Sequence, residues 1–172
     1  MRNRSLLGAG TVAAVCLLLI SLAQTKNISA NTAQKENSMA VHASGTFEVK
    51  VAPQTATEFE TSVGLARYSL DKEIHGDLEG TSKGEMLATN TEVKGSAAYV
   101  ALEKVTGTLN GRAGSFVLQH SASMTSNSQQ MLITVVPDSG TGQLFGITGR
   151  FIIKIVDKKH FYEFDYVLPP VN

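Results

Sequence analysis

The sequence predicts an all-β domain that closes into a barrel of eight antiparallel strands, and three observations predict it. Apolar and polar side chains alternate along eight segments after residue 42, as in Phe47, Val49 and Val51, which is the period of a strand with one buried face. Stretches rich in Gly, Asn, Asp and Pro separate these segments. The sequence shows no amphipathic helix of useful length between them. Short links between successive strands imply an antiparallel meander, and closing it into a barrel removes the exposed sheet edges.

The candidate strands follow one another along the chain at Ala43–Ala52, Leu65–Ile74, Leu78–Thr89, Ser96–Thr108, Gly114–Thr125, Gln130–Val136, Ile147–Val156 and His160–Leu168. Residues that favour chain reversal lie between them, such as His75-Gly76-Asp77 and Asn110-Gly111. The four prolines fall at strand ends, where no hydrogen-bond donor of the sheet is lost. A two-sheet sandwich built from the same strands remains the alternative, because periodicity does not distinguish it from a barrel.

The N-terminal 23 residues have the pattern of a signal peptide or membrane anchor. Arg2 and Arg4 precede an apolar run from Leu6 to Leu22. Small residues three places and one place before Gln24 allow cleavage there, and we favour cleavage over a retained helical anchor. Val15 before the single cysteine, Cys16, argues against a lipoprotein signal. We therefore expect a periplasmic or secreted protein, with an inner-membrane anchored protein as the alternative.

The chain after residue 23 divides into a spacer and a folded domain. Residues 24–40 are polar and lack periodicity, which predicts a flexible spacer. Residues 41–172 form the predicted barrel domain, whose composition contains no cysteine for a disulfide or a thiolate metal site. No cluster of Lys and Arg suggests a nucleic-acid partner. Contact with a membrane is expected only through an uncleaved leader.

Several blocks of the domain resemble a known family. They are HASGTFEV from His42, HGDLEGTSKG from His75, YVALE from Tyr99, GSFVLQH from Gly114, VPDSGTG from Val136 and KHFYEFDY from Lys159. In this order they resemble the bacterial family catalogued as domain of unknown function 3224, over about residues 41–168. The resemblance implies a closed eight-stranded barrel similar to that of allene oxide cyclases, and it implies no activity. Members usually begin near the position of Met39, so cytoplasmic initiation at Met39 is a minor alternative.

The candidate site lies on the predicted inner faces of the strands. Lys72 shares a face with Tyr68 and Leu70, and His120 shares an apolar stripe with Leu118 and Ala122. If these faces line one lumen, the polar side chains that converge there are Lys72, Tyr99, Glu103, His120 and Tyr162. An apolar pocket with a few polar groups is typical of a small-ligand site. The alternatives are that these groups are satisfied core residues, that Lys72 and Glu103 form a structural ion pair, or that one stripe faces outward.

Other motifs are better explained as structure. Ser82 lies in a G-x-S-x-G match within a predicted strand, without the following helix that a nucleophile elbow needs. Its strand face of small residues instead indicates crowding or a bend. The four histidines lie far apart in sequence, without the close spacing of a metal site, so we predict no metal and no cofactor. Glu58 and Glu60 are interpreted as part of a solvated outer face.

Three functions follow from these observations. The first is an exported barrel that binds a small apolar molecule in its lumen. The second is a cofactor-independent isomerase or cyclase that acts on such a molecule, through Glu103 and His120. The third is a structural or interaction protein with a filled core, which forms a homodimer through an apolar outer patch. The sequence favours binding over catalysis, and it identifies no catalytic residue.

Overall fold

The computed structural model describes residues 39–170. The expected leader and residues 24–38 of the expected spacer lie outside the described residues. No helix within residues 39–170 is long and apolar enough to cross a membrane.

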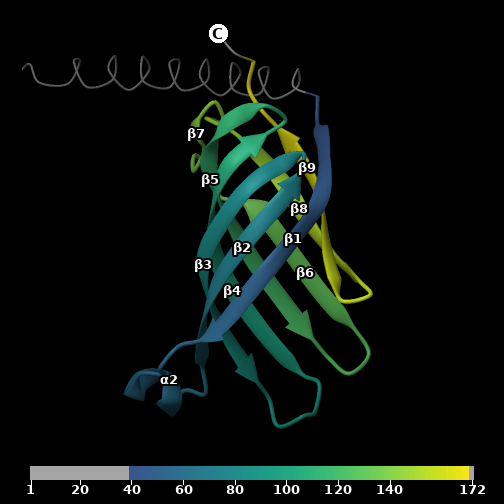
Figure 1. Ribbon diagram of the computed structural model, residues 1–172. Helices are drawn as coiled ribbons and strands as arrows, with labels where there is room; N and C mark the ends of the chain where they lie inside the picture. Colours follow the sequence, from purple (N-terminus) through teal and green to yellow (C-terminus); the bar gives the residue numbers. More distant parts are fainter. Residues whose placement is uncertain (1–38, 171–172) are drawn as a thin grey trace, which may run out of the picture. The chain divides into compact units, whose positions relative to one another are not determined.

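Eight antiparallel strands form the barrel, in an order that follows the chain (Figure 1). They are β1 (Val41–Pro53), β2 (Ala66–Gly76), β3 (Leu78–Asn90), β4 (Ala97–Leu109), β5 (Arg112–Met124), β6 (Gln129–Val135), β8 (Thr148–Val156) and β9 (Lys159–Val167). The short β7 (Thr141–Gly142) pairs with β5. Because β9 pairs with β1 and β4 pairs with β5, the sheet closes on itself. The predicted barrel is therefore confirmed and the sandwich excluded, with every strand end within two residues of its predicted position.

One end of the barrel is sealed by apolar side chains. Seven inward-facing residues of this half are 2% exposed or less, namely Ile74, Leu78, Val105, Leu109, Phe116, Leu118 and Phe164, and Phe151 and Tyr166 are 4% exposed. The segment between β6 and β8 covers this end and contributes Leu144 and Ile147, which are fully buried. Hydrogen bonds hold the segment in place, since the Val117 amide donates to Ser139 Oγ at 3.0 Å and the Ala113 amide donates to Gln143 Oε1 at 2.9 Å.

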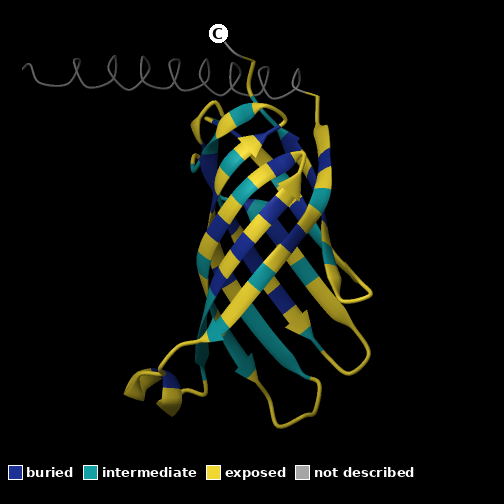
Figure 2. Cartoon of the chain, in the orientation of Figure 1, coloured by how far each residue is buried: buried dark blue, intermediate teal, exposed yellow. Residues whose placement is uncertain are grey.

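The other end of the barrel is open. Most of its inward-facing residues are half-buried or exposed, and they include Val49, Tyr68, Met86, Tyr99, Met131 and Ile153, with Val51 48% and Ile155 65% exposed, whereas the small Ala101 and Ala122 are buried. Figure 2 shows the change, because buried positions give way to intermediate ones toward the end that carries α2. An eight-stranded barrel is just wide enough to be filled by its own side chains or to hold one small ligand. In this barrel the inward-facing side chains are buried in one half and mostly partly exposed in the other.

The connection between β1 and β2 corrects one expectation. Residues Glu58–Ser62 form the short helix α2 rather than an outer strand face. Glu60 closes a capping box with Thr57, whose amide donates to Glu60 Oε2 at 2.6 Å, and it also accepts from Arg67 Nε at 3.1 Å. Glu60 is therefore only 9% exposed. The T-x-x-E spacing of a capping box was the signal in the sequence.

Candidate functional site

A cluster of polar side chains lies inside the barrel, at the boundary between its sealed and open halves. Lys72, Ser82, Glu103 and His120 come from the four adjacent strands β2, β3, β4 and β5. All four are between 1% and 6% exposed. The strand pairing brings them together, because Lys72 is opposite Ser82 and His120 is opposite Ala101, two residues before Glu103. Buried charges are retained where they are paired, and this cluster contains such a pair.

Glu103 is the centre of the cluster. The Lys72 ammonium donates to Glu103 Oε2 at 2.7 Å, and the Ser82 hydroxyl donates to Oε1. His120 Nε2 lies 3.1 Å from Oε2. Burial by itself raises the pKa of the Glu103 carboxyl, but His120, Lys72 and Ser82 together lower this pKa from its ordinary 4.5 to about 2. Glu103 is therefore a carboxylate at neutral pH.

His120 is held differently from its neighbours. Its Nε2 atom is fully buried, yet it makes no hydrogen bond of good geometry with any described residue, despite its closeness to the Glu103 carboxylate. Most buried polar atoms in proteins have a partner. A role in stabilising the fold therefore explains the Lys72–Glu103 pair, but it does not explain why His120 Nε2 is buried without a hydrogen bond to a described residue.

Two further residues shape the cluster. The Lys72 ammonium lies 4.8 Å from the centre of the Phe47 ring, a distance suited to a cation–π contact. Gly84 is opposite Glu103, and a Cβ atom there would collide with the Leu102 carbonyl oxygen. A side chain larger than hydrogen is excluded at that point, which agrees with the crowding predicted for this strand face.

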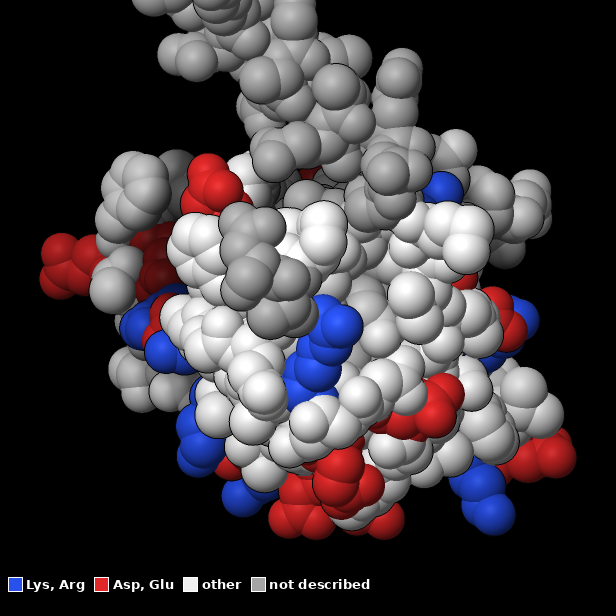
Figure 3. Space-filling view, turned by 90° about the horizontal axis from the view of Figure 1, so that it is seen from above, with Lys and Arg blue, Asp and Glu red and all other residues white. Residues whose placement is uncertain are grey.

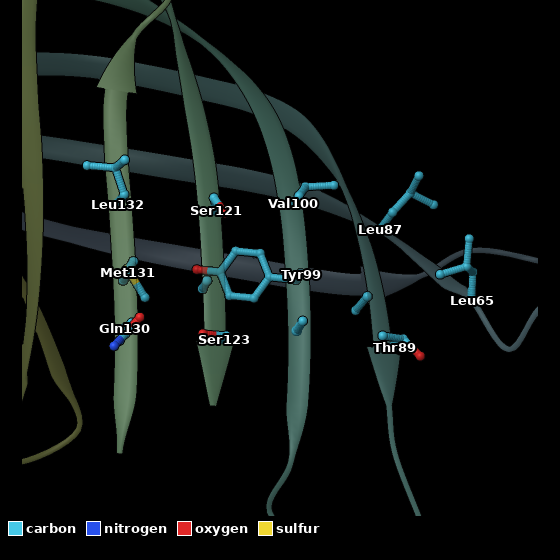
Figure 4. Close-up of a pocket in the computed structure, with 13 residues that line it drawn as sticks. Leu65, Leu87, Thr89, Tyr99, Val100, Ser121, Ser123, Gln130, Met131 and Leu132 are labelled. Atoms are coloured by element: carbon cyan, nitrogen blue, oxygen red, sulfur yellow. The ribbon is translucent and has the colours of Figure 1, made fainter. Parts of the chain in front are cut away.

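Tyr99 lies on the open side of the cluster, on the same face of β4 as Glu103. It is half-buried, and burial together with the negative charge of Glu103 raises the pKa of its hydroxyl. Figure 4 shows its ring extending from β4 toward β5. An open pocket of about 670 Å³ borders this edge of the barrel. Most of its lining residues face outward, among them Leu87, Val100 and Leu132, whereas Ala88, Tyr99, Ala122 and Met131 face inward.

Tyr162 is part of the sealed half and does not join the cluster. Its hydroxyl accepts a hydrogen bond from the Leu78 amide at 2.8 Å, and its ring stacks on Phe151 at 5.1 Å. The structure thus brings Lys72, Glu103 and His120 together, places Tyr99 beside them, and gives Tyr162 a role in the core.

Sequence reasoning missed the part that Ser82 plays. The sequence placed Ser82 on a strand face of small residues, and its hydroxyl on that face was the available signal. Within residues 39–170, no group of three His, Cys, Asp or Glu side chains is arranged to hold a metal ion.

The outer surface carries an apolar stripe across β3, β4 and β6. Leu87, Val100, Leu102 and Leu132 are between 38% and 58% exposed. A view from above shows charged side chains of both signs scattered over the described part of the visible face, around larger uncharged areas (Figure 3). The stripe is an apolar outer patch of the kind expected for a homodimer, and the homodimer itself stays a prediction.

The fold and the cluster define the chain as a small, closed, antiparallel β-barrel protein with a buried ion cluster. The family model described as "Protein of unknown function (DUF3224)" matches residues 43–166, so the chain belongs to this family. The resemblance found in the sequence is confirmed.

One solved structure supports the same assignment. It is a crystal structure of a protein with unknown function from the DUF3224 family of Shewanella oneidensis MR-1, which is 46% identical to this chain with a TM-score of 0.72. The match covers 77% of this chain and 100% of that one. None of the curated proteins matches. The likeness to allene oxide cyclases stays a prediction.

Proposed function

We propose that this barrel binds a small, largely apolar molecule in the open half of its lumen. The observation that carries the proposal is the division of the interior, since apolar side chains fill one half while most inward-facing residues of the other half remain partly exposed. A protein that needed only a stable core would gain by filling both halves, because buried apolar area stabilises the fold. A pocket that is mostly apolar with a few polar groups is typical of small-molecule sites.

The ion cluster supplies the polar end of the proposed site. Lys72, Glu103 and His120 lie where the sealed half ends, so a molecule that enters from the open end meets them at the bottom of the lumen. Tyr99, Met131 and Ala122 line the wall above them.

A neutral apolar dye tests the proposal. The fluorescence of N-phenyl-1-naphthylamine rises in apolar surroundings, so titration of the purified domain reports uptake. Ala122→Phe places a ring in the lumen and is expected to weaken dye binding by tenfold or more. Thr106→Phe adds the same ring to the exposed outer face of β4 and is the matched control. No uptake by the wild type, or equal uptake by the two variants, contradicts the proposal.

Catalysis is the second candidate, and the close approach of Glu103 and His120 favours it. An acid and an imidazole 3.1 Å apart resemble a proton-transfer pair. However, a carboxylate with a pKa of about 2 is a weak base at neutral pH, and efficient general bases have a pKa near the working pH. Binding is therefore the function that the cluster supports better. Replacing Glu103 with Gln abolishes turnover in an isomerase, whereas in a carrier it only changes affinity.

A further inference from the structure

We infer that the ligand presents a hydrogen-bond acceptor, a carbonyl or carboxylate oxygen, to Lys72 and His120. The inference rests on the proposed function and names the chemical class of its ligand. It follows from which hydrogen-bond donors and acceptors of the cluster have no partner within the described part of the chain.

The acceptors of the cluster are already engaged. Glu103 Oε1 accepts from Ser82, and Oε2 accepts from Lys72 while His120 Nε2 stands 3.1 Å away. Both oxygens of this carboxylate therefore have close donors. A ligand that offers a further donor would have to share an oxygen that already has a hydrogen-bond partner, because Ser82 Oγ, Glu103 Oε1 and Glu103 Oε2 each have one.

The donors, in contrast, are in surplus. An ammonium group has three N–H donors, and among the described residues Lys72 uses one of them, toward Glu103. His120 Nε2 makes no hydrogen bond of good geometry with any of residues 39–170. We assign the proton to this nitrogen, because an unprotonated Nε2 would turn its lone pair toward a carboxylate oxygen 3.1 Å away, which is repulsive. The N–H is not aligned with that oxygen well enough for a hydrogen bond, so it is left for another acceptor.

The two spare donors lie close to each other. Lys72 Nζ and His120 Nε2 share one neighbour, Glu103 Oε2, so a single oxygen-bearing head group is able to meet both. Such a head group would satisfy the buried nitrogen that the protein leaves without a partner. An apolar ketone, ester or carboxylic acid has the required chemistry, with its apolar chain directed toward the open end.

Three compounds of equal chain length test the inference by displacement of N-phenyl-1-naphthylamine. Nonan-2-one offers only a neutral acceptor, and nonylammonium offers only donors. Nonanoate offers a charged acceptor, so comparing it with nonan-2-one shows whether the site prefers a carboxylate or a neutral carbonyl. We expect at least one of the two acceptor compounds to bind about tenfold more tightly than nonylammonium, since one good hydrogen bond contributes roughly that factor. The better of the two identifies the head group.

Two substitutions at His120 test the assigned donor. His120→Phe keeps a planar ring without a donor and is expected to reduce the preference for acceptors. His120→Gln keeps an N–H donor and is expected to retain most of it. If His120→Phe does not fold, the relative affinities of the wild type for the three compounds still show whether the site prefers an acceptor.

The outcomes separate the two proposals. Equal affinities, a preference for nonylammonium, or a failure of all three compounds to displace a bound dye overturns the acceptor inference and leaves lumen binding intact. A preference that His120→Phe leaves unchanged overturns the role of His120. If the dye and all three compounds fail to bind, the proposed function falls, and the inference falls with it.

Discussion

Lys72 and Glu103 form an ion pair across an intervening strand inside the barrel. Their side chains come from β2 and β4, and β3 between them contributes only Ser82 and Gly84 at this level. The ammonium and the carboxylate are 2.7 Å apart, and both side chains are almost completely buried. Such a pair need not stabilise the fold more than apolar residues would, yet removing one partner leaves an uncompensated buried charge.

Replacing Lys72 with Met is therefore expected to destabilise the domain strongly. The Glu103 carboxylate would remain buried without its counter-charge, and breaking a buried ion pair costs about 3–5 kcal/mol. The double variant Lys72→Met with Glu103→Leu is expected to recover much of this loss, because no charge is then left in the interior. Urea unfolding followed by circular dichroism measures both free energies.

Lys83 provides the control for this experiment. It pairs with Asp71 at 3.3 Å, but its side chain is 79% exposed. Exposed ion pairs contribute little to stability, so Lys83→Met is expected to change the free energy of unfolding only slightly. Similar losses for Lys72→Met and Lys83→Met would show that the buried pair has no special energetic role.

Acid is expected to destabilise the domain in part through Glu103. The folded-state pKa of this carboxyl is lowered from 4.5 to about 2, so its contribution to stability is present above pH 4.5 and is lost as the pH falls toward 2. The shift corresponds to a loss on the order of 3 kcal/mol. Glu103→Gln should flatten the plot of unfolding free energy against pH in this window.

Glu79→Gln is the matched control for the acid experiment. A hydrogen bond from His75 lowers the pKa of this carboxyl, but the side chain is 62% exposed and water screens the effect. Glu79→Gln should therefore flatten the plot of unfolding free energy against pH clearly less than Glu103→Gln does. If the unfolding free energy of Glu103→Gln fell in parallel with that of the wild type between pH 2 and 4.5, the lowered pKa of Glu103 would be contradicted.

The barrel was predictable because its strands carry strict alternation and its turns carry residues that favour reversal. What alternation does not reveal is the segment from 136 to 147, where Leu144 and Ile147 are buried without any period. The helix α2 was missed for a related reason. Five residues are too short for a helical hydrophobic pattern, and only the capping box of Thr57 and Glu60 indicated it.

The candidate site was predictable only as a set of inner faces. Alternation places Lys72, Glu103 and His120 inside, but their contact depends on the register between β2, β3, β4 and β5, which a single sequence does not fix. Tyr162 shows that facing inward does not imply contact with the cluster. It also faces inward, yet it lies at another level of the barrel and binds the Leu78 backbone.

Export is tested by the mass of the protein recovered from cells. Signal peptidase accepts small residues at the positions held by Ser21 and Ala23, so the mature chain is expected to begin at Gln24 and to fractionate outside the cytoplasm. Ala23→Phe should block this cleavage and leave the full-length chain in the membrane fraction. A wild-type chain that keeps residues 1–23 would indicate an anchor, and one that begins at Met39 would contradict export.

Two tyrosines of the inner face are expected to respond oppositely to loss of their hydroxyl groups. Tyr162→Phe leaves the buried Leu78 amide without its acceptor, which should lower the free energy of unfolding by about 1–3 kcal/mol. Dye binding should be unchanged, because Tyr162 belongs to the sealed half. Tyr99→Phe is expected to preserve stability, since this side chain is half-buried, and to change dye affinity from the wall of the open half. Urea unfolding and dye titration of both variants give the four values. If Tyr162→Phe alters dye binding while Tyr99→Phe does not, the ligand cannot lie in the open half of the lumen.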